Sequence, residues 1–434
     1  MKIPEIYGLF QTFPSIKTDT REDVRNSIFV ALRGDRFNGN DFAREALEKG
    51  AAYAIVDRSD QVTDNRLILV DDCLETLQQL ATFHRTKVEA AVVAITGSNG
   101  KTTTKELVRD ILASKYRVYA TEGNLNNHIG VPLSLLKLKA DTEFGIIEMG
   151  ANHVGEISKL CRIAKPDHGL ITNIGRAHIE GFGSLEGVKI AKGELYRYLS
   201  EERGTVFIDA GNQVLNQLSE GFKGRLIRYG KAPGSLCRGY AAGAHPYLTF
   251  SISFNEEPAR EYSGKTRLVG SYNLENILAA ACIGRHFNVE IEQILDAVGK
   301  YDPGMMRSML MEKGNNLLVV DTYNANPTSM EHAIRDFASD PHSSKVLILG
   351  EMKEMGDSEI AEHENLIENL KGQLFRDVIL VGPVFSRITI PEGYITFKST
   401  GECAEYLEKR SFENTKFLLK GSRLLKLEEL IDYI

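Results

Sequence analysis

The strongest chemical signal in the sequence is a short glycine-rich segment that leads into a helix. Residues 95–104 read Ile-Thr-Gly-Ser-Asn-Gly-Lys-Thr-Thr-Thr, an apolar strand end followed by a turn and a helix expected to begin near Lys101. Glycines let successive backbone N–H groups point inward, and a helix N-terminus adds positive potential for phosphate oxygens. In such a loop the lysine reaches the β- and γ-phosphates, and the Thr102 hydroxyl binds Mg²⁺. The segment predicts a nucleotide site made by Gly97, Ser98, Asn99, Gly100, Lys101, Thr102 and Thr103.

The spacing of this loop differs from the common G-x-x-x-x-G-K-[ST] pattern, because Ile95 stands five residues before Gly100. The loop is the shorter T-G-x-x-G-K-T. A glycine turn that arose by chance is the alternative interpretation. The coincidence of strand, glycines, lysine, threonine and helix favours nucleotide binding.

Three further side chains have types suited to metal or acid–base chemistry. Glu148 ends a buried-looking strand, where carboxylates of α/β sheets meet ligands, although an edge salt bridge would also explain it. His178 follows the strand 169–172 by a short loop, and a lone histidine is more often structural than a ligand. Lys192 lies on a helix-like run, where a solvated lysine is the ordinary interpretation, and Lys189 would share its helix face.

The composition excludes several classes of protein. The 434 residues are 42% hydrophobic and 26% charged, as in ordinary globular proteins and unlike disordered or fibrous ones. The net charge of −7 argues against a protein that coats nucleic acid. The apolar run 277–283 is far too short for a membrane helix, and no secretory signal is visible at the N-terminus. We therefore expect a cytoplasmic protein without membrane insertion. The five cysteines lack any C-x-x-C spacing and are expected to be reduced.

Strand-like and helix-like runs alternate along the whole chain, which predicts α/β layers arranged in three domains. Residues 1–88 form the first predicted domain. Residues 89–302 form a central domain with a mostly parallel sheet of P-loop type, in which 247–254 alternates like an exposed antiparallel strand. A hinge at 303–304 leads to residues 303–434, where strands and helix-sized segments predict a Rossmann-like, doubly wound sheet.

Several segments resemble, in order along the chain, the Mur ligases, the ATP-dependent amide-forming enzymes of peptidoglycan precursor synthesis. The loop at 97–104 resembles that family's ATP loop. The other matching segments are 121–132 (substrate-proximal loop), Glu148-Met-Gly-Ala-Asn-His153 and Thr172-Asn-Ile-Gly-Arg-Ala-His178 (metal-binding segments), and 29–39 (UDP-binding domain). Asp321-Thr-Tyr-Asn-Ala-Asn-Pro327 and Lys420-Gly-Ser-Arg423 resemble the members that use D-alanyl-D-alanine, and the Asp-Asn-Pro-Arg tetrapeptide of a sister group does not occur.

The resemblance implies an ATP-dependent ligase that joins D-alanyl-D-alanine to UDP-N-acetylmuramoyl-tripeptide through an acyl phosphate and forms ADP. ATP, Mg²⁺ and these two substrates would be its ligands, and a monomer is expected. One alternative is another amide ligase on the same scaffold, such as a folate polyglutamyl ligase; residues 1–88 and 321–327 argue against it. The other is a non-catalytic nucleotide switch, which the intact Lys101, Glu148 and His178 disfavour.

The resemblance also implies roles for single residues. Lys101, His178 and Lys192 would be catalytic, and the metal ligands would be Thr102, Glu148, His178 and Lys192, the lysine as a carbamate. Asn276 would face the adenine, Arg307 the ATP phosphates and Asp321 the ribose. Substrate contacts would come from Ser27, Arg33, Asn126, Asn127, Tyr323, Asn324, Asn326 and Arg423, the last gripping the dipeptide carboxylate. Turn or capping duty would also explain the asparagines, and the choice between Asn126 and Asn127 stays open.

Overall fold

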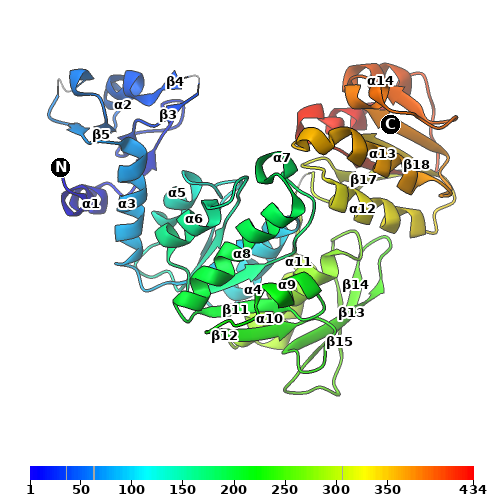
Figure 1. Cartoon of the computed structure of the whole chain (residues 1–434), viewed down its shortest axis with the longest axis horizontal. Helices are drawn as coiled ribbons and strands as arrows, with labels where there is room; N and C mark the ends of the chain where they lie inside the picture. The colour runs from blue at the N-terminus through cyan, green and yellow to red at the C-terminus, as the bar shows by residue number, and fades with distance from the viewer. Residues whose placement is uncertain (36, 62–63, 305) are drawn as a thin grey trace.

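Three main β-sheets follow one another along the described residues and are visible as three parts in Figure 1, and a two-stranded sheet accompanies the first. The computed structural model describes residues 1–35, 37–61, 64–304 and 306–434. Each sheet falls inside one of the three predicted ranges, while the exact domain boundaries stay predictions. The mixed α/β class expected from the alternating pattern is confirmed.

The first sheet is small and wholly parallel, with the order β1-β2-β5-β6. Its elements are α1 (Ile3–Thr12), β1 (Ile16–Lys17), β2 (Ile28–Val30), α2 (Ala43–Glu48), β5 (Tyr53–Val56) and β6 (Leu67–Leu69). The polar stretch after β2 contains two short antiparallel strands, β3 (Arg33–Gly34) and β4 (Phe37–Asn38).

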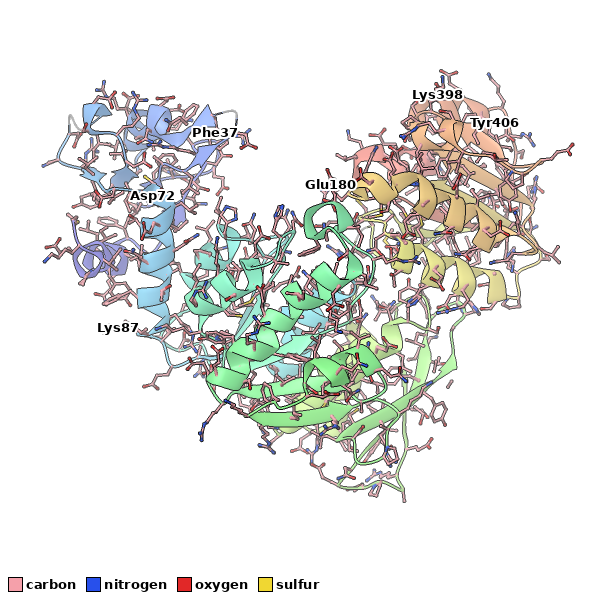
Figure 2. All side chains as sticks on the ribbon, viewed as in Figure 1. Phe37, Asp72, Lys87, Glu180, Lys398 and Tyr406 are labelled. Atoms are coloured by element: carbon pink, nitrogen blue, oxygen red, sulfur yellow. The ribbon has the colours of Figure 1, made fainter. Side chains whose placement is uncertain are left out.

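A single helix, α3 (Cys73–Arg85), connects this first sheet to the central one, and Figure 2 labels Asp72 and Lys87 next to its two ends. Asp72 caps the helix by accepting from the Glu75 amide at 2.6 Å. At the other end the buried Arg85 guanidinium donates to the carbonyl oxygens of Ala164 and Lys165 and to the Asp167 carboxylate. These bonds fix the last turn of α3 firmly against the central sheet.

The central sheet has the strand order β15-β14-β13-β12-β11-β10-β7-β9-β8. The strands β7 to β13 run parallel, and β14 and β15 add an antiparallel edge. The strands are β7 (Ala91–Thr96), β8 (Val118–Ala120), β9 (Phe144–Glu148), β10 (His168–Ile171), β11 (Thr205–Asp209), β12 (Arg225–Tyr229), β13 (Cys237–Gly243), β14 (Thr249–Phe254) and β15 (Tyr262–Lys265).

Helices cover both faces of the central sheet. They are α4 (Lys101–Ala113), α5 (Gly130–Leu135), α6 (Glu156–Ala164), α7 (Ile179–Phe182), α8 (Leu185–Glu201), α9 (Gln213–Leu218), α10 (Asn273–His286) and α11 (Ile291–Lys300). One apolar core includes Leu160 of α6 and Leu195 of α8, and a second core includes Leu107 of α4 and Ile277 of α10. The apolar run 277–283 lies in α10, between α4 and the sheet. Because this part of the helix is apolar on all sides, it is buried all round.

The expectation of an exposed antiparallel strand at 247–254 is only half right. β14 is antiparallel, but it lies between β13 and β15, and Phe250, Ile252 and Phe254 are buried. On the opposite face Ser251 is also buried and donates to Glu261 Oε2 at 2.8 Å. Ser251 is therefore a buried polar position with a hydrogen-bond partner, while Thr249 and Ser253 on the same strand stay partly exposed.

The third sheet has the order β16-β17-β21-β18-β19-β20, and all its strands except the edge strand β16 are parallel. Its elements are β16 (Met309–Lys313), β17 (Asn316–Asp321), α12 (Pro327–Ser339), β18 (Lys345–Gly350), α13 (Glu359–Leu370), β19 (Asp377–Val381), β20 (Ile395–Phe397), α14 (Thr400–Leu407) and β21 (Lys416–Lys420). Apolar cores lie on both faces, with Ile334 in one and Leu407 in the other, so the doubly wound prediction is confirmed. The strands β16 and β20 were not predicted.

Two remaining expectations concern the membrane and the cysteines. Within the described residues, none of the helices combines the length and the apolar composition that crossing a bilayer requires. The five cysteines are buried free thiols, as expected, and burial raises the pKa of Cys73 to about 12. A thiol with so high a pKa is a poor nucleophile, so we assign the cysteines to packing.

Candidate active site

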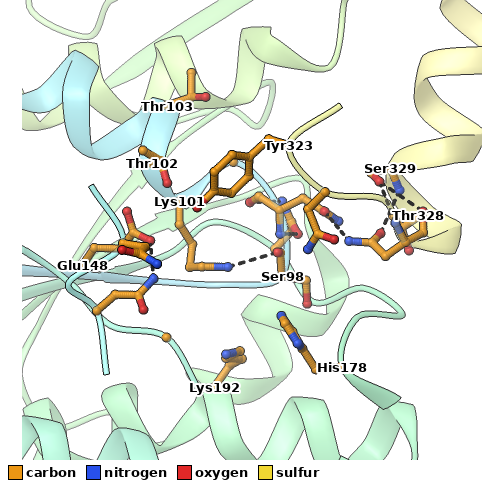
Figure 3. A pocket seen from close by; sticks show the side chains of 18 of the residues that line it. Ser98, Lys101, Thr102, Thr103, Glu148, His178, Lys192, Tyr323, Thr328 and Ser329 are labelled. Carbon is orange, nitrogen blue, oxygen red and sulfur yellow. Dashed lines mark hydrogen bonds between the residues drawn. The ribbon is translucent and has the colours of Figure 1, made fainter. Parts of the chain in front are cut away.

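A cavity of about 890 Å³ lies between the central and third sheets. The carboxyl ends of β7, β9 and β10 form its central-sheet side, and the carboxyl ends of β17 and β21 face them. Ligands of open α/β sheets bind at this edge. Figure 3 shows the side chains of Lys192 and His178 pointing toward Lys101 across this space.

The predicted phosphate loop joins β7 to α4 and is fixed by the segment that follows β10. Gly100 precedes the first helical residue with a φ of +78°, a conformation that favours glycine. Thr172 Oγ1 donates to the Asn99 carbonyl at 2.6 Å, and the Asn99 amide donates to Asn173 Oδ1 at 3.0 Å. Lys101 Nζ donates to the carbonyl oxygens of Gly97 and Ser98, and burial lowers its pKa.

Glu148 lies at the end of β9 with its carboxylate in the cavity and almost fully buried. Its Oε1 accepts from Asn126 Nδ2 at 2.8 Å. Its Oε2 has no hydrogen-bond partner among the described residues, and Lys105 Nζ is 3.9 Å away. A buried carboxylate oxygen without a donor, in a cavity that Thr102 also lines, fits a cation that prefers oxygen ligands.

The residues that could hold a metal are few. In the described ranges, no group of three or more His, Cys, Asp or Glu side chains comes together as a metal site. Mg²⁺ keeps several waters and commonly binds one or two carboxylates together with substrate phosphates. The pair Thr102 and Glu148 therefore fits Mg²⁺ held largely by the nucleotide.

Lys192 and Lys189 are separated by the fold, although both lie on α8. The Lys192 side chain is 2% exposed, and Nζ donates to the Ala151 carbonyl at 3.4 Å. Burial, followed by the charge of Lys101, lowers the pKa of Lys192 to about 7. Lys189 instead lies 3.8 Å from Glu186 and lines a different surface groove. The two lysines thus do not share an environment, and Lys192 is the one at the cavity.

His178 precedes α7 and contacts a residue that the sequence did not single out. Its Nδ1 lies 2.6 Å from Glu354 Oε2, a contact that lowers the pKa of Glu354. Glu354 follows β18 in the segment Gly350-Glu-Met-Lys-Glu-Met-Gly356 and also lines the cavity. The signal that could have found it is its place just after a parallel strand, at the ligand-binding edge of the sheet.

The third sheet contributes Asp321, Tyr323, Asn324 and Asn326 to the cavity, as expected. Asp321 ends β17 and accepts from Lys420 Nζ at 2.5 Å. The Arg307 guanidinium lies 3.6 Å from the centre of the Tyr323 ring and also lines the cavity. Arg423 is exposed, with its guanidinium 5.2 Å from the same ring. Lys420 also lines the cavity, although the sequence predicted no contact for this side chain on its own.

The asparagines divide into different duties. Asn127 Oδ1 accepts from the amides of Ile129 and Gly130 at the start of α5. Asn276 Oδ1 accepts from Thr104 Oγ1 at 3.1 Å, and so lies in the contact between α10 and α4 beside the phosphate loop. Asn324 Oδ1 accepts from the following amide, and Asn326 Oδ1 caps α12 through the Ser329 amide. Asn127, Asn324 and Asn326 therefore do form the capping or turn hydrogen bonds that were the alternative explanation for them.

Ser27 and Arg33 lie in the first sheet. Ser27 is fully buried, and its hydroxyl donates to the Val24 carbonyl at 2.5 Å, which does not support the predicted ligand contact of this side chain. The exposed Arg33 guanidinium donates to Asp57 Oδ1 at 2.7 Å, and Asn40 Nδ2 donates to the same oxygen. Arg33 is thus accessible at a polar cluster next to the ends of β2 and β5.

Comparison with known proteins adds relatives over almost the whole chain. Residues 95–284 match the Mur ligase middle domain, and residues 306–423 match the "Mur ligase, glutamate ligase domain". The UDP-N-acetylmuramoyl-tripeptide–D-alanyl-D-alanine ligase of Bacillus subtilis (strain 168) is 34% identical over 436 residues, which cover 96% of this chain and 92% of the relative.

Solved structures give the same picture. A crystal structure of MurF from Acinetobacter baumannii is 28% identical with a TM-score of 0.87, covering 98% of this chain and 97% of the other. MurF ligase from Thermotoga maritima in complex with ADP is 28% identical with a TM-score of 0.86, covering 97% of each chain.

Proposed function

The chain belongs to the Mur ligase family, and from this premise we propose that it joins D-alanyl-D-alanine to UDP-N-acetylmuramoyl-tripeptide at the cost of ATP. The observation that carries the proposal is one cavity shared by Lys101 and Glu148 of the central sheet and Tyr323 of the third. A phosphate site and an acceptor site that face each other suit a reaction between a phosphorylated acyl group and an amine. The product would be a precursor of peptidoglycan, with the consequent role in cell shape and division.

The nucleotide is proposed to bind with its phosphates on the loop before α4. The loop amides and the start of α4 would receive the phosphate oxygens. Lys101 now donates to the carbonyl oxygens of Gly97 and Ser98, and it would exchange these for the β- and γ-phosphates. Arg307 is proposed to contact the phosphates, Asp321 the ribose and Asn276 the adenine side.

Thr102 and Glu148 are proposed to hold Mg²⁺, with His178 and Lys192 serving a second ion. Mg²⁺ supplies charge neutralisation for the phosphoryl group. An ammonium at Lys192 would repel a cation, whereas a carbamate presents two oxygens. The carbamate would form when the neutral amine adds to carbon dioxide and a proton is released to solvent, and the lowered pKa of Lys192, about 7, makes the neutral amine available near neutral pH.

The proposed reaction has two steps. The C-terminal carboxylate of the tripeptide attacks the γ-phosphorus of ATP, giving an acyl phosphate and ADP. The amine of D-alanyl-D-alanine then attacks the acyl carbon, and the tetrahedral intermediate loses phosphate and a proton to give the amide. Lys101 stabilises the charge during transfer, and the enclosing sheets keep water from the acyl phosphate. Tyr323, Asn324, Asn326 and Arg423 are proposed to bind the dipeptide, Asn126 and Asn127 the tripeptide, and the first domain the UDP group.

Two other functions are distinguished by experiment. A folate polyglutamyl-type ligase would use the same central chemistry with another amine. A nucleotide switch would bind ATP and form no amide. Near full-length similarity to a tripeptide ligase and the complete set Lys101, Glu148 and Lys192 in one cavity favour the proposed reaction. The cytoplasm, where ATP is available, is the proposed location, and the monomeric state stays a prediction.

The deciding experiment is a phosphate-release assay with product detection by mass spectrometry. ATP, Mg²⁺, UDP-N-acetylmuramoyl-tripeptide and D-alanyl-D-alanine are supplied together and then each is omitted in turn. We expect phosphate and the amide in equal amounts, and neither without any one component. Amide formation with glutamate in place of the dipeptide would support the folate-type alternative, and ATP binding without turnover would support the switch.

A further inference from the structure

The segment that carries His178 is held from outside its own sheet. The Arg176 amide donates to Thr328 Oγ1 at 3.1 Å, and the Glu180 amide donates to the Glu354 carbonyl at 3.1 Å. Both acceptors, Thr328 and Glu354, belong to the third-sheet part of the chain. Figure 2 labels Glu180 on α7, where this helix approaches the third-sheet part. His178 thus lies between two backbone anchors that the third sheet provides.

A side-chain ion pair adds to these anchors. The Arg176 guanidinium lies 3.2 Å from Glu362 Oε2 and 3.8 Å from Glu331 Oε2. The Glu362 side chain is only 11% exposed, whereas that of Glu331 is 48% exposed. An exposed pair contributes little, but a shielded carboxylate that loses its partner is costly. Glu362, on α13, is therefore the main partner of Arg176.

The backbone at this contact is in a conformation that needs support. His178 has a φ of +54° and Glu354 a φ of +63°, both left-handed and neither residue a glycine. Such conformations are sparsely populated and persist where the surroundings impose them. Gly356 lies close by, and a Cβ there would come within 3.2 Å of the Glu180 Cα. The segment is therefore shaped by close packing from both sides.

We propose that Glu362 is a positioning residue for the reaction: through Arg176 it holds the 173–180 segment, and with it His178, in place against the third sheet. The inference rests on the proposed function. Its consequence is an order of events, because His178 reaches its place only when the third sheet, with the amine site, is docked. Acyl phosphate then forms where the amine can use it, and less is lost to water.

The third sheet also docks through contacts that do not involve Arg176. Ser271 donates from its amide and its hydroxyl to the Asp336 carboxylate at 2.5 and 3.0 Å. His245 Nδ1 lies 3.0 Å from Asp340 Oδ2. Removing the Glu362 charge should therefore loosen the 173–180 segment and leave α12 docked, which separates positioning from simple undocking.

The test compares Glu362→Gln with Glu364→Gln, which removes an exposed carboxylate from the same helix. Hydrogen exchange by mass spectrometry on the ligand-free protein follows peptides from 173–182 and from α12. For Glu362→Gln we expect faster exchange in 173–182, unchanged exchange in α12, a fall in kcat of about tenfold and an ATP KM within about twofold of wild type. Arg176→Lys, which keeps the charge, should restore part of the loss seen in Arg176→Ala.

Two results would overturn the inference. One is equal behaviour of Glu362→Gln and Glu364→Gln in both exchange and kcat. The other is faster exchange in α12 together with 173–182, which would show loss of docking rather than of positioning. The exchange data need no substrate, so they decide the role of Glu362 even if the wild-type protein makes no amide, a result that would count against the proposed function alone.

Discussion

Asn326 Nδ2 donates to Asn99 Oδ1 at 2.7 Å, so the residue that caps α12 touches the phosphate loop directly. Because Asn326 Oδ1 also accepts from the Ser329 amide, one side chain both starts the helix and joins it to the loop. The third sheet therefore contacts the nucleotide site at the point where phosphate oxygens are expected. A nucleotide that displaced Asn99 would act directly on the hydrogen bond to Asn326 at the start of α12.

The two loop asparagines should give different losses. Asn126→Ala removes the donor to Glu148, so we expect a fall in kcat of about tenfold and a higher Mg²⁺ requirement. Asn127→Ala removes the acceptor of two amides before α5 and should lower the free energy of unfolding by about 1 kcal/mol. Steady-state kinetics against Mg²⁺ concentration and urea denaturation measure the two effects. A larger kinetic loss for Asn127→Ala would assign the substrate contact to that residue.

Gly100→Ala should damage nucleotide binding through a specific clash. A Cβ at this position would lie 2.4 Å from Asn276 Oδ1, in a backbone conformation that disfavours side chains. We expect the ATP KM to rise by about tenfold or more, since the loop must shift away from the phosphates. Gly155→Ala is the control, because its φ of +93° is equally unfavourable but nothing lies within 4 Å. An unchanged ATP KM in Gly100→Ala would contradict the placement of the phosphates.

Alanine substitutions at Lys192 and at Lys189 should have very different effects on kcat. We expect Lys192→Ala to lose about a hundredfold or more in kcat and to recover partly with acetate, which can occupy the vacated place as a carboxylate. Lys189→Ala, with its side chain in another groove, should stay within about threefold of wild type. Assays in CO₂-depleted and bicarbonate-containing buffer test the carbamate itself. Lys192→Ala at near wild-type activity would remove the assignment.

His286 should make the protein less stable in mild acid. Burial, with Arg225 nearby, lowers its pKa from 6.5 to about 4. Between these two values the unfolded chain takes up a proton that the folded protein does not, so the free energy of unfolding falls as the pH drops through this window. From pH 7 to pH 5 we expect wild type to lose about 1 kcal/mol more than His286→Gln. Urea denaturation at both pH values is the measurement, and parallel losses in the two proteins would contradict it.

The sequence predicted the parts of the site that are local. The phosphate loop combines glycines, Lys101 and a helix start within a few residues, and α4 begins at Lys101 directly after the glycine turn. Strand ends gave Glu148 and Asp321 for the same reason, because the edge of a parallel sheet collects them. The doubly wound third sheet followed from well-spaced apolar strands.

What the sequence missed depends on contacts between distant segments. The position of Glu354 after a parallel strand could have indicated the edge of the sheet, but its contact with His178 forms only where two sheets meet. The same holds for the contact of Arg176 with Glu362. β14 was expected to be exposed because its alternation matches a half-solvated strand, yet it is an inner strand and its residues 250–252 are all buried. Ser27 was expected at a ligand because its position resembles a UDP-contacting one in the family, and its burial depends on packing that the local sequence does not show.

The single helix α3 has a consequence for substrate size. Its 13 residues span about 20 Å at 1.5 Å per residue, and Arg85 fixes one end to the central sheet while the first sheet lies at the other. If the first sheet holds the nucleotide-sugar end as proposed, α3 sets the distance from that end to the cavity. The helix would then act as a ruler, so that a peptide of one length brings its carboxylate to Lys101, while a shorter peptide stops short and a longer one overshoots.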